Sequence, residues 1–265
     1  MTAPRVLSVT GPGSDPSQHV VAVEPSPRRV RVFFGDQVIA DTTRVGLLFE
    51  TGLLPIYYFP REDVKMDRLH PTDRTSDCPY KGRARYWTVR AGDRAAENAA
   101  WSYPEPTANS PDLSQLIAFD WRSMDAWYEE DDEVFVHPRS PYHRVDVVES
   151  SRCVEVKIEG VTVAESSRPR FLYETGLPTR YYLPKLDVRT ELLRPEKLTT
   201  QCPYKGVASY WSVSLNGKTH ENIVWSYGTA IPENPKIAGL LCFFNEKVDI
   251  YLDGELEERP STQWS

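Results

Sequence analysis

Apolar and polar residues alternate in two long segments of the chain. RRVRVFFGDQVIAD (residues 28–41) and RCVEVKIEGVTVAE (residues 152–165) place apolar side chains at nearly every second position, the period of a strand with one buried face. Each segment carries a turn signal at its centre, Gly-Asp at 35–36 and Glu-Gly at 159–160. Each therefore predicts a β-hairpin.

The residues after these hairpins predict a short helical turn in each half, over residues 44–50 and 168–174. Gly52 and Gly176 stand where a helix would be expected to stop. The apolar runs YYFP and YYLP that follow predict strands, and their prolines end them.

Later residues predict further β structure. Residues 86–103 and 210–227 read as a second hairpin in each half, the latter with an Asn-Gly turn. Residues 117–128 and 241–252 predict a last pair of elements, and the segment before them, near Pro111 or Pro235, has room for one helical turn.

The two halves are copies of one unit. Cys-Pro-Tyr-Lys-Gly begins at Cys78 and again at Cys202, and 202 − 78 = 124. The same offset holds without a gap from the pair His19/His143 to the pair Asp125/Asp249. The sequence thus predicts a mainly β fold, two tandem copies of a small β-tent-like or barrel domain with short helices, related by a pseudo-two-fold axis.

The limits of the repeat give the expected domain boundaries. We expect a flexible N-terminal tail over residues 1–15, a first domain over 16–130 and a second over 131–260, which includes a linker over 131–142. The acidic stretch at residues 129–133 is expected to be a solvated surface connection.

The composition of the chain argues against two classes of binding partner, nucleic acids and membranes. The 265 residues carry a net charge of -7 with no basic run, which argues against nucleic acid. No apolar stretch approaches the ~20 residues that a membrane helix needs, and the start of the chain lacks the features of a signal peptide. We expect a cytoplasmic monomer, an internal pseudo-dimer, with four free thiols, no metal and no cofactor, because no cysteine pair has zinc-ligand spacing.

Several motifs occur in the same order in both copies. VIADTTRVGLLFE, YYFPREDV, CPYKG, YW and ENAAWSYPEP, with their second-copy counterparts VAESSRPRFLYE, YYLPKLDV, CPYKG, YW and ENIVWSY, resemble the bacterial family called domain of unknown function 427. The chain is similar to the tandem members common in actinobacteria. The resemblance implies a small β architecture like the β-tent modules that include methionine sulfoxide reductase B, and it brings no established activity.

A nucleotidyltransferase-like label attached to that family is not supported by the residues. Nucleotidyl transfer normally needs a Gly-Ser turn followed by paired aspartates that hold magnesium. The chain contains no Asp-x-Asp, and its Gly13-Ser14 lies outside the repeat.

The repeated Cys-Pro-Tyr-Lys-Gly motif is the strongest chemical candidate. Its proline and glycine favour a tight turn that could project a cysteine and a lysine into one cavity, and a desolvated lysine can act as a base or a Schiff-base nucleophile. The alternative is a structural turn whose lysine is ion-paired with Glu50 or Asp63. The catalytic candidates are Lys81, Lys205, Glu50, Glu174, Cys78 and Cys202.

Glutamates, histidines and aromatic residues also recur at the offset of 124, and each has a functional and a structural interpretation. Glu50 and Glu174 end apolar runs and could serve as general acid or base, or simply pair with Arg44 or Lys81; Glu97 and Glu221 are further candidates. For the matched histidines we expect a hydrogen bond at a strand edge rather than catalysis. Most matched aromatic residues should form the core, with exceptions among Tyr58, Trp101 and Tyr103.

These residues support three hypotheses. The first is a metal-free module with one pocket per repeat for a small organic ligand. The second is an enzyme that uses the lysine, glutamate and cysteine in acid–base or imine chemistry. The third is a structural or protein-interaction module, which a broad exposed apolar patch would indicate. The ligand-binding candidates are Arg44, Arg168, Tyr58, Tyr182, Trp101, Trp225, Tyr103 and Tyr227.

Overall fold

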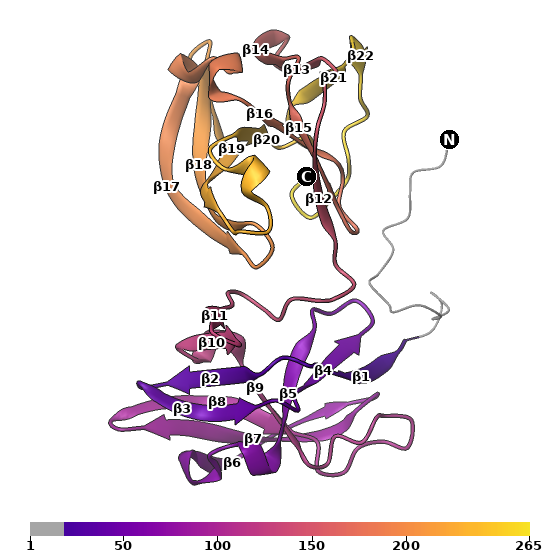
Figure 1. Ribbon diagram of the computed structural model, residues 1–265, viewed down its shortest axis with the longest axis vertical. Helices are drawn as coiled ribbons and strands as arrows, with labels where there is room; N and C mark the ends of the chain where they lie inside the picture. The colour runs from indigo at the N-terminus through magenta and orange to yellow at the C-terminus, as the bar shows by residue number, and fades with distance from the viewer. Residues whose placement is uncertain (1–18) are drawn as a thin grey trace. The chain divides into compact units, whose positions relative to one another are not determined.

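A computed structural model describes residues 19–265 and divides the chain into two compact units at Tyr142 and His143 (Figure 1). The expected tail over residues 1–15 lies outside the described residues. Residues 132–133 form a strand that pairs within the first unit, so part of the segment that the sequence division gave to the second domain belongs with the first.

The first unit contains eleven strands. They are β1 (Val21–Pro25), β2 (Val30–Phe34), β3 (Gln37–Thr42), β4 (Gly46–Glu50), β5 (Ile56–Pro60), β6 (Leu69–Cys78), β7 (Gly82–Ala91), β8 (Arg94–Ser102), β9 (Leu116–Phe119), β10 (Ala126–Glu129) and β11 (Asp132–Glu133). Three 3-10 turns connect them: η1 (Arg61–Asp63), η2 (Met66–Arg68) and η3 (Trp121–Ser123).

The second unit repeats this order. Its strands are β12 (Val145–Glu149), β13 (Val154–Ile158), β14 (Val161–Ser166), β15 (Arg170–Glu174), β16 (Arg180–Leu183), β17 (Leu193–Cys202), β18 (Gly206–Leu215), β19 (Lys218–Ala230), β20 (Leu241–Phe243), β21 (Asp249–Leu252) and β22 (Glu255–Leu256). Its 3-10 turns are η4 (Lys185–Asp187), η5 (Thr190–Leu192) and η6 (Pro235–Ile237).

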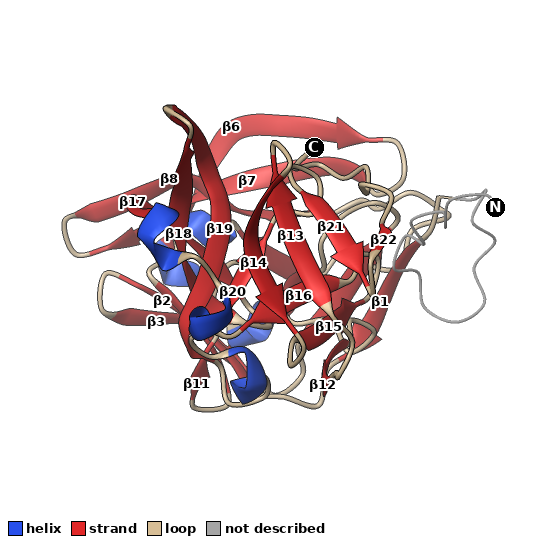
Figure 2. Ribbon diagram, turned by 90° about the horizontal axis from the view of Figure 1, so that it is seen from above, coloured by secondary structure: helices blue, strands red, loops and turns tan. Residues whose placement is uncertain are grey.

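Each unit is built from two antiparallel sheets (Figure 2). In the first unit a seven-stranded sheet runs β1-β4-β5-β9-β8-β7-β6 and a four-stranded sheet runs β11-β10-β2-β3. The second unit has the same arrangement, β12-β15-β16-β20-β19-β18-β17 and β14-β13-β21-β22. The mainly β fold in two similar copies is therefore confirmed, as two open sheets per unit, and within residues 19–265 no sheet closes into a barrel. No helix in this part of the chain is long and apolar enough to cross a membrane.

The main core of the first unit lies between its two sheets. Val30 and Val32 of β2 are fully buried there and pack with Tyr57 and Phe59 of β5. Because side chains alternate across a strand, Tyr58 points to the other face of the seven-stranded sheet. It joins a second, smaller cluster of buried side chains there: Leu48, Tyr58, Ala84, Tyr103, Leu113 and Ala118.

The predicted hairpins are present, and their turns have the expected backbone. In the first hairpin Gly35 and Asp36 have φ of 56° and 58°, and in its copy Glu159 and Gly160 have φ of 49° and 79°. Two consecutive positive φ values are the signature of the turn that matches the twist of a two-residue hairpin. Of the two places suggested for a helical turn, only the one at Pro235 forms it.

The expectation of a short helical turn was wrong in both units. Residues 44–50 and 168–174 do not form helical turns, because their apolar residues lie in β4 and β15. The strands β6 and β17 were not foreseen, since both are polar and almost wholly exposed edge strands without an apolar alternation.

The acidic stretch is not uniformly solvated. Glu129 is buried, and its carboxylate accepts hydrogen bonds from the Tyr57 hydroxyl and the Arg28 guanidinium. Arg139 adds a third donor at 3.1 Å. Only the following residues, 130–133, are exposed as expected. Glu129 is buried because it faces inward from β10 and has enough donors to replace water.

Candidate functional site

Glu50 is the centre of the polar contacts on the outer face of the seven-stranded sheet. It is the last residue of β4 and lies opposite Val21 of β1, so the residues just before β1 run past its carboxylate. His19 reaches it there, with Nε2 3.1 Å from Oε1 of Glu50. Thr51 fixes this approach, because its hydroxyl accepts a hydrogen bond from the Val20 amide at 2.9 Å.

Lys81 supplies the second partner of Glu50. It lies in the three-residue turn between β6 and β7, where Cys78 pairs with Gly82. Its ammonium donates a hydrogen bond to Oε2 of Glu50. The side chains of Lys81 and Glu50 are 8% and 5% exposed, so this is a buried ion pair, one of the two outcomes that the sequence allowed for the lysine.

The glycine of the motif holds the lysine turn in place. Gly82 has φ of +103°, and a Cβ there would lie 2.7 Å from the carbonyl oxygen of Glu105. The neighbouring Thr107 donates its hydroxyl to the Tyr80 carbonyl at 2.7 Å and its amide to the Lys81 carbonyl at 3.3 Å. The close approach that requires glycine is therefore between two backbone segments.

The aromatic residue of the same turn covers the histidine. The rings of Tyr80 and His19 are stacked, with centroids 3.6 Å apart and planes at 13°. Tyr80 is 44% exposed, and the His19 side chain is 26% exposed. Together they form the side of the cluster that solvent reaches.

Tyr58 and Trp101 close the inner side. Both lie opposite Ala118 on β9, the strand between β5 and β8. The small alanine leaves room for the indole to cross β9, and Trp101 Nε1 donates a hydrogen bond to the Tyr58 hydroxyl at 3.1 Å. Burial raises the pKa of Tyr58 well above its usual value, and the Trp101 hydrogen bond opposes only part of that rise.

Tyr103 and Cys78 complete this group. The Lys81 ammonium lies 5.8 Å from the centroid of the Tyr103 ring, within the range of a cation–π contact. Burial, together with the nearby Cys78 and Glu50, raises the pKa of Tyr103. We call His19, Glu50, Lys81, Tyr58, Trp101, Tyr103, Tyr80 and Cys78 the Glu–Lys cluster.

The second unit builds the same cluster. His143 Nε2 lies 3.0 Å from Oε1 of Glu174, and the Lys205 ammonium donates to Oε2. Trp225 Nε1 donates to the Tyr182 hydroxyl at 3.1 Å. The stack is formed by His143 and Tyr204, whose centroids are 4.2 Å apart.

In this second cluster the pKa of the glutamate is lowered, whereas the pKa values of the cysteine and of a tyrosine are raised. Desolvation alone would raise the pKa of Glu174, but the His143 hydrogen bond and the Lys205 charge outweigh it, and the pKa is lowered. Desolvation also raises the pKa of the Cys202 thiol, and there the opposing pull of Lys205 is too weak to reverse it. Desolvation likewise raises the pKa of Tyr227. The carboxylate is thus held charged beside a protonated thiol and a neutral phenol.

Two groups of candidates lie elsewhere. Arg44 is exposed and bonds Asp63 of η1 with both contacts at 2.9 Å, and Arg168 does the same with Asp187 at 3.1 Å. Arg44 also pairs with Glu62 of the same turn at 2.7 Å. The partners of both arginines are thus nearby surface carboxylates and not Glu50 or Glu174, so neither arginine contributes a polar contact to the cluster. The candidates Glu97 and Glu221 are exposed on their hairpins.

His19 and His143 were expected only to make hydrogen bonds at a strand edge, and the tyrosines stacked on them were expected in the core. The histidines do precede the edge strands β1 and β12, but their hydrogen bonds go to the buried glutamates. The sequence does carry one indication that these histidines matter, because they are the one pair of histidines that both copies share. The spacing along the chain does not show that β1 lies against β4, so the sequence alone does not bring His19 to Glu50.

The arrangement provides one fixed negative charge, one fixed positive charge and a row of hydrogen-bonding groups between solvent and the sheet. Within residues 19–265, no three His, Cys, Asp or Glu side chains converge as a metal site would require. The side chains of the cluster can support polar recognition and proton transfer.

Comparison with known proteins agrees with the repeat. No curated protein matches the chain. The model of one family, described as a domain of unknown function (DUF427), matches twice, over residues 22–130 and 146–254. Each match covers the glutamate, the lysine and the Trp–Tyr pair of one Glu–Lys cluster, whereas His19 and His143 lie just outside the matched residues. The chain therefore belongs to the DUF427 family, of which it carries two copies in tandem.

Proposed function

We propose that each unit binds a small organic ligand at its Glu–Lys cluster. The observation that carries the proposal is that both units keep the same buried ion pair, with the same histidine and the same Trp–Tyr hydrogen bond. A buried ion pair is a poor way to gain stability, because its desolvation cost is comparable to its Coulombic gain. A recognition role supplies a reason for both copies to keep it.

The exposure of the cluster indicates how a ligand would arrive. Lys81 and Glu50 are enclosed, whereas Tyr80 is 44% exposed and His19 is partly exposed. A ligand would therefore enter at the His–Tyr stack, by binding against it or by displacing it. A planar molecule with hydrogen-bonding groups at one edge suits that approach, because it can replace one ring of the stack and reach the ion pair.

Acid–base catalysis is the second candidate, and one observation favours it. In each unit a partly exposed histidine is hydrogen-bonded to a buried carboxylate, which is in turn bonded to a lysine. Such a chain can carry a proton between solvent and a bound molecule. Imine chemistry is less favoured, since the lysine that would need to be a free amine donates to a carboxylate.

Binding can be tested with a library of small aromatic acids, amides and amines. We expect library members to give ligand-observed NMR signals with the unmodified chain and with the double variant R44A/R168A, which removes only the surface pairs. Signals should be lost in Y80A/Y204A, which changes the entry side, and in K81M/K205M, which changes the ion pairs. Equal binding by all four proteins would exclude the cluster as the site.

The same experiment separates binding from catalysis. Mass spectrometry of each bound library member after incubation should show an unchanged mass if the units only bind. A new product that depends on Lys81 or Lys205 would instead establish the acid–base candidate.

A further inference from the structure

A row of aromatic side chains crosses the outer face of the seven-stranded sheet in the first unit. Tyr86 of β7 lies directly opposite Trp101 of β8, so their rings are neighbours on one face of the sheet. Trp101 in turn donates to the Tyr58 hydroxyl on β5. Tyr86 and Trp101 pack against the buried cluster on this face, yet both are partly exposed. The row therefore offers aromatic surface to solvent.

Arg74 of β6 stands at the end of this row. Its guanidinium lies 4.7 Å from the centroid of the Tyr86 ring, within the range of a cation–π contact. The Tyr86 hydroxyl is hydrogen-bonded to the Ser76 hydroxyl at 2.8 Å, which fixes the ring beside the guanidinium. Arg74 is exposed, and no carboxylate within residues 19–265 forms an ion pair with it. The row thus ends in a cation that a ring orients and no acid neutralises.

A bulge in β6 carries Arg74 to this position. The register of β6 against β7 shifts at residues 72–74, and a bulge of this kind re-aims the side chains that it carries. The Thr72 hydroxyl donates to Oδ1 of Asn98 on β8 at 2.7 Å, which anchors the bulge across β7. Arg74 is therefore held by the sheet and does not depend on a long loop.

The second unit has no such cation. Leu198 occupies the place of Arg74, in a bulge at the same point of β17, and is 43% exposed. The bulge does contain Lys197, but no ring in the described part of the chain lies within cation–π range of its ammonium. The end of the row is therefore apolar in the second unit.

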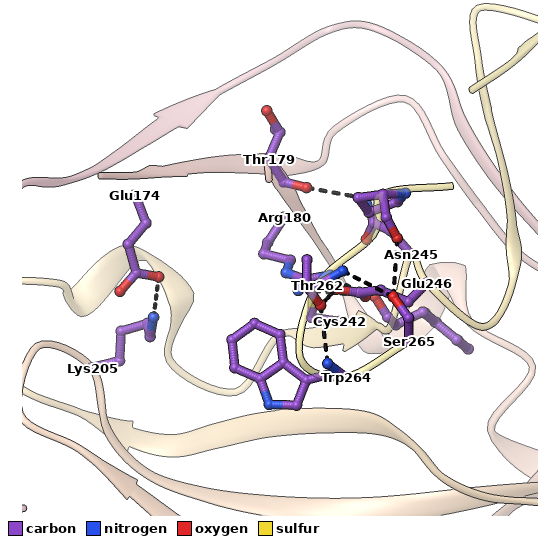
Figure 3. A network of polar contacts seen from close by, with 12 residues as sticks. Glu174, Thr179, Arg180, Lys205, Cys242, Asn245, Glu246, Thr262, Trp264 and Ser265 are labelled. Atoms are coloured by element: carbon purple, nitrogen blue, oxygen red, sulfur yellow. Dashed lines mark hydrogen bonds and ion pairs between the residues drawn. The ribbon is translucent and has the colours of Figure 1, made fainter. Parts of the chain in front are cut away.

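The indole of the second unit is also covered. Trp225 is only 7% exposed, since the Phe244 ring lies 4.6 Å from it and the Arg180 guanidinium 5.5 Å. Arg180 is fixed there by two hydrogen bonds of 2.7 Å to the buried carboxylate of Glu246 (Figure 3). In the first unit the places of Arg180 and Phe244 are held by Ile56 and Asp120.

We infer that the first unit carries a second binding site, for an aromatic carboxylate, formed by Arg74, Tyr86 and Trp101. Arg74 lies two strands away from Trp101, and neighbouring strands are about 4.8 Å apart. A two-ring acid can therefore lie on the indole with its carboxylate at the guanidinium, which binds carboxylates through two parallel hydrogen bonds. The site shares Trp101 with the Glu–Lys cluster but does not use the ion pair, so the inference goes beyond the proposed function and does not rest on it.

Titration with 2-naphthoate, followed by NMR of the tryptophan indole N–H groups, tests the site. In the unmodified chain the Trp101 signal should shift and the Trp225 signal should not; W101F and W225F identify the two signals. R74L gives the first unit the residue of the second and should weaken binding about tenfold, because the charge-assisted hydrogen bonds are lost.

Two controls separate the site from a general effect of charge. R85S removes an arginine from the opposite face of the same hairpin, again in favour of the second copy's residue, and should leave the affinity unchanged within error. The neutral analogue 2-naphthamide should bind more weakly than the acid and equally well to R74L. An unshifted Trp101 signal, or equal affinity of the acid for R74L and the unmodified chain, would overturn the inference.

The variant Y80A distinguishes this inference from the proposed function. Loss of 2-naphthoate binding in Y80A, with full binding in R74L, would place the acid at the entry of the Glu–Lys cluster. That result would refute the second site and support the proposed function. Loss in R74L with full binding in Y80A would support the second site, whatever the library shows for the cluster.

Discussion

The two units share the Glu–Lys cluster and differ in what surrounds it. In both, a histidine and a lysine bind the two oxygens of one glutamate, and a tryptophan donates to a tyrosine across a small residue of the central strand. Beyond that group, Ile56 of the first unit is replaced by Arg180 in the second, and Ala118 by Cys242. Arg180 forms a buried ion pair with Glu246 in the second unit, and the first unit has Ile56 and Arg122 at the corresponding positions.

The difference shows where change is tolerated in this fold. Loss of either member of a buried ion pair leaves an uncompensated charge in a place that water does not reach. A position around the cluster can change to a charged residue if a residue of opposite charge is present to pair with it. Arg180 is such a case, because it pairs with Glu246. The Glu–Lys pair is therefore kept in both units, whereas the residues around it differ.

The largest expected effect comes from breaking the shared ion pair. E50L should destabilise the first unit by about 3–5 kcal/mol, because Lys81 is left buried and unpaired. E174L should do the same in the second unit, and urea unfolding followed by circular dichroism measures both. The double variants E50L/K81M and E174L/K205M should recover most of the loss. A nearly neutral E50L beside a costly E174L would show that the pairs are not equivalent.

Replacing the glycine that follows each lysine should give the second-largest loss of stability. G82A should cost roughly 1–3 kcal/mol, because alanine must adopt a positive φ and its Cβ would meet the Glu105 oxygen at 2.7 Å. G206A should cost less, since the corresponding distance to the Thr229 oxygen is 3.0 Å. G92A, at a positive φ with open space around it, is the matched control and should cost only about 1 kcal/mol. Equal losses in all three variants would mean that the close approach is unimportant.

The buried tyrosines predict instability in alkali. Tyr58 and Tyr182 have pKa values raised above the ordinary value of 10.0, so the folded chain keeps protons that the unfolded chain loses. Below pH 10 this makes no difference, and above it the stability falls by about 1.4 kcal/mol per pH unit for each such group. Phenolate absorption during a pH titration should rise with unfolding, and Y58F or Y182F should reduce the slope. Ionisation of both tyrosines without loss of structure would contradict their burial.

The smallest effect is expected from the surface arginines. R44A and R168A each remove an exposed ion pair with an aspartate of a 3-10 turn, and solvent screens such pairs strongly. Thermal unfolding should be unchanged within error in both variants. A clear loss in one unit only would reveal a role for that arginine that its exposed contacts do not explain.

Several parts of the fold and the site could be predicted from the sequence because they depend on neighbours along the chain. The hairpins follow from alternation and from turn residues such as Gly35 and Asn216, and both turns form. The lysine and the glutamate were recognised because both copies keep them. The error at residues 44–50 has a local cause as well, since a short apolar run fits a helix and a strand equally well.

The amino-acid sequence alone determined the duplication, the β class and the recurrence of Glu50 and Lys81 in the second copy. Only the tertiary structure decided which side chains meet them. His19 reaches Glu50 because β1 pairs with β4 across 31 residues of chain, and Arg44 does not because Asp63 of η1 lies closer to it. The physical reason is that strand pairing between distant segments is set by burial of the whole sheet, which leaves no trace in the spacing of any single motif.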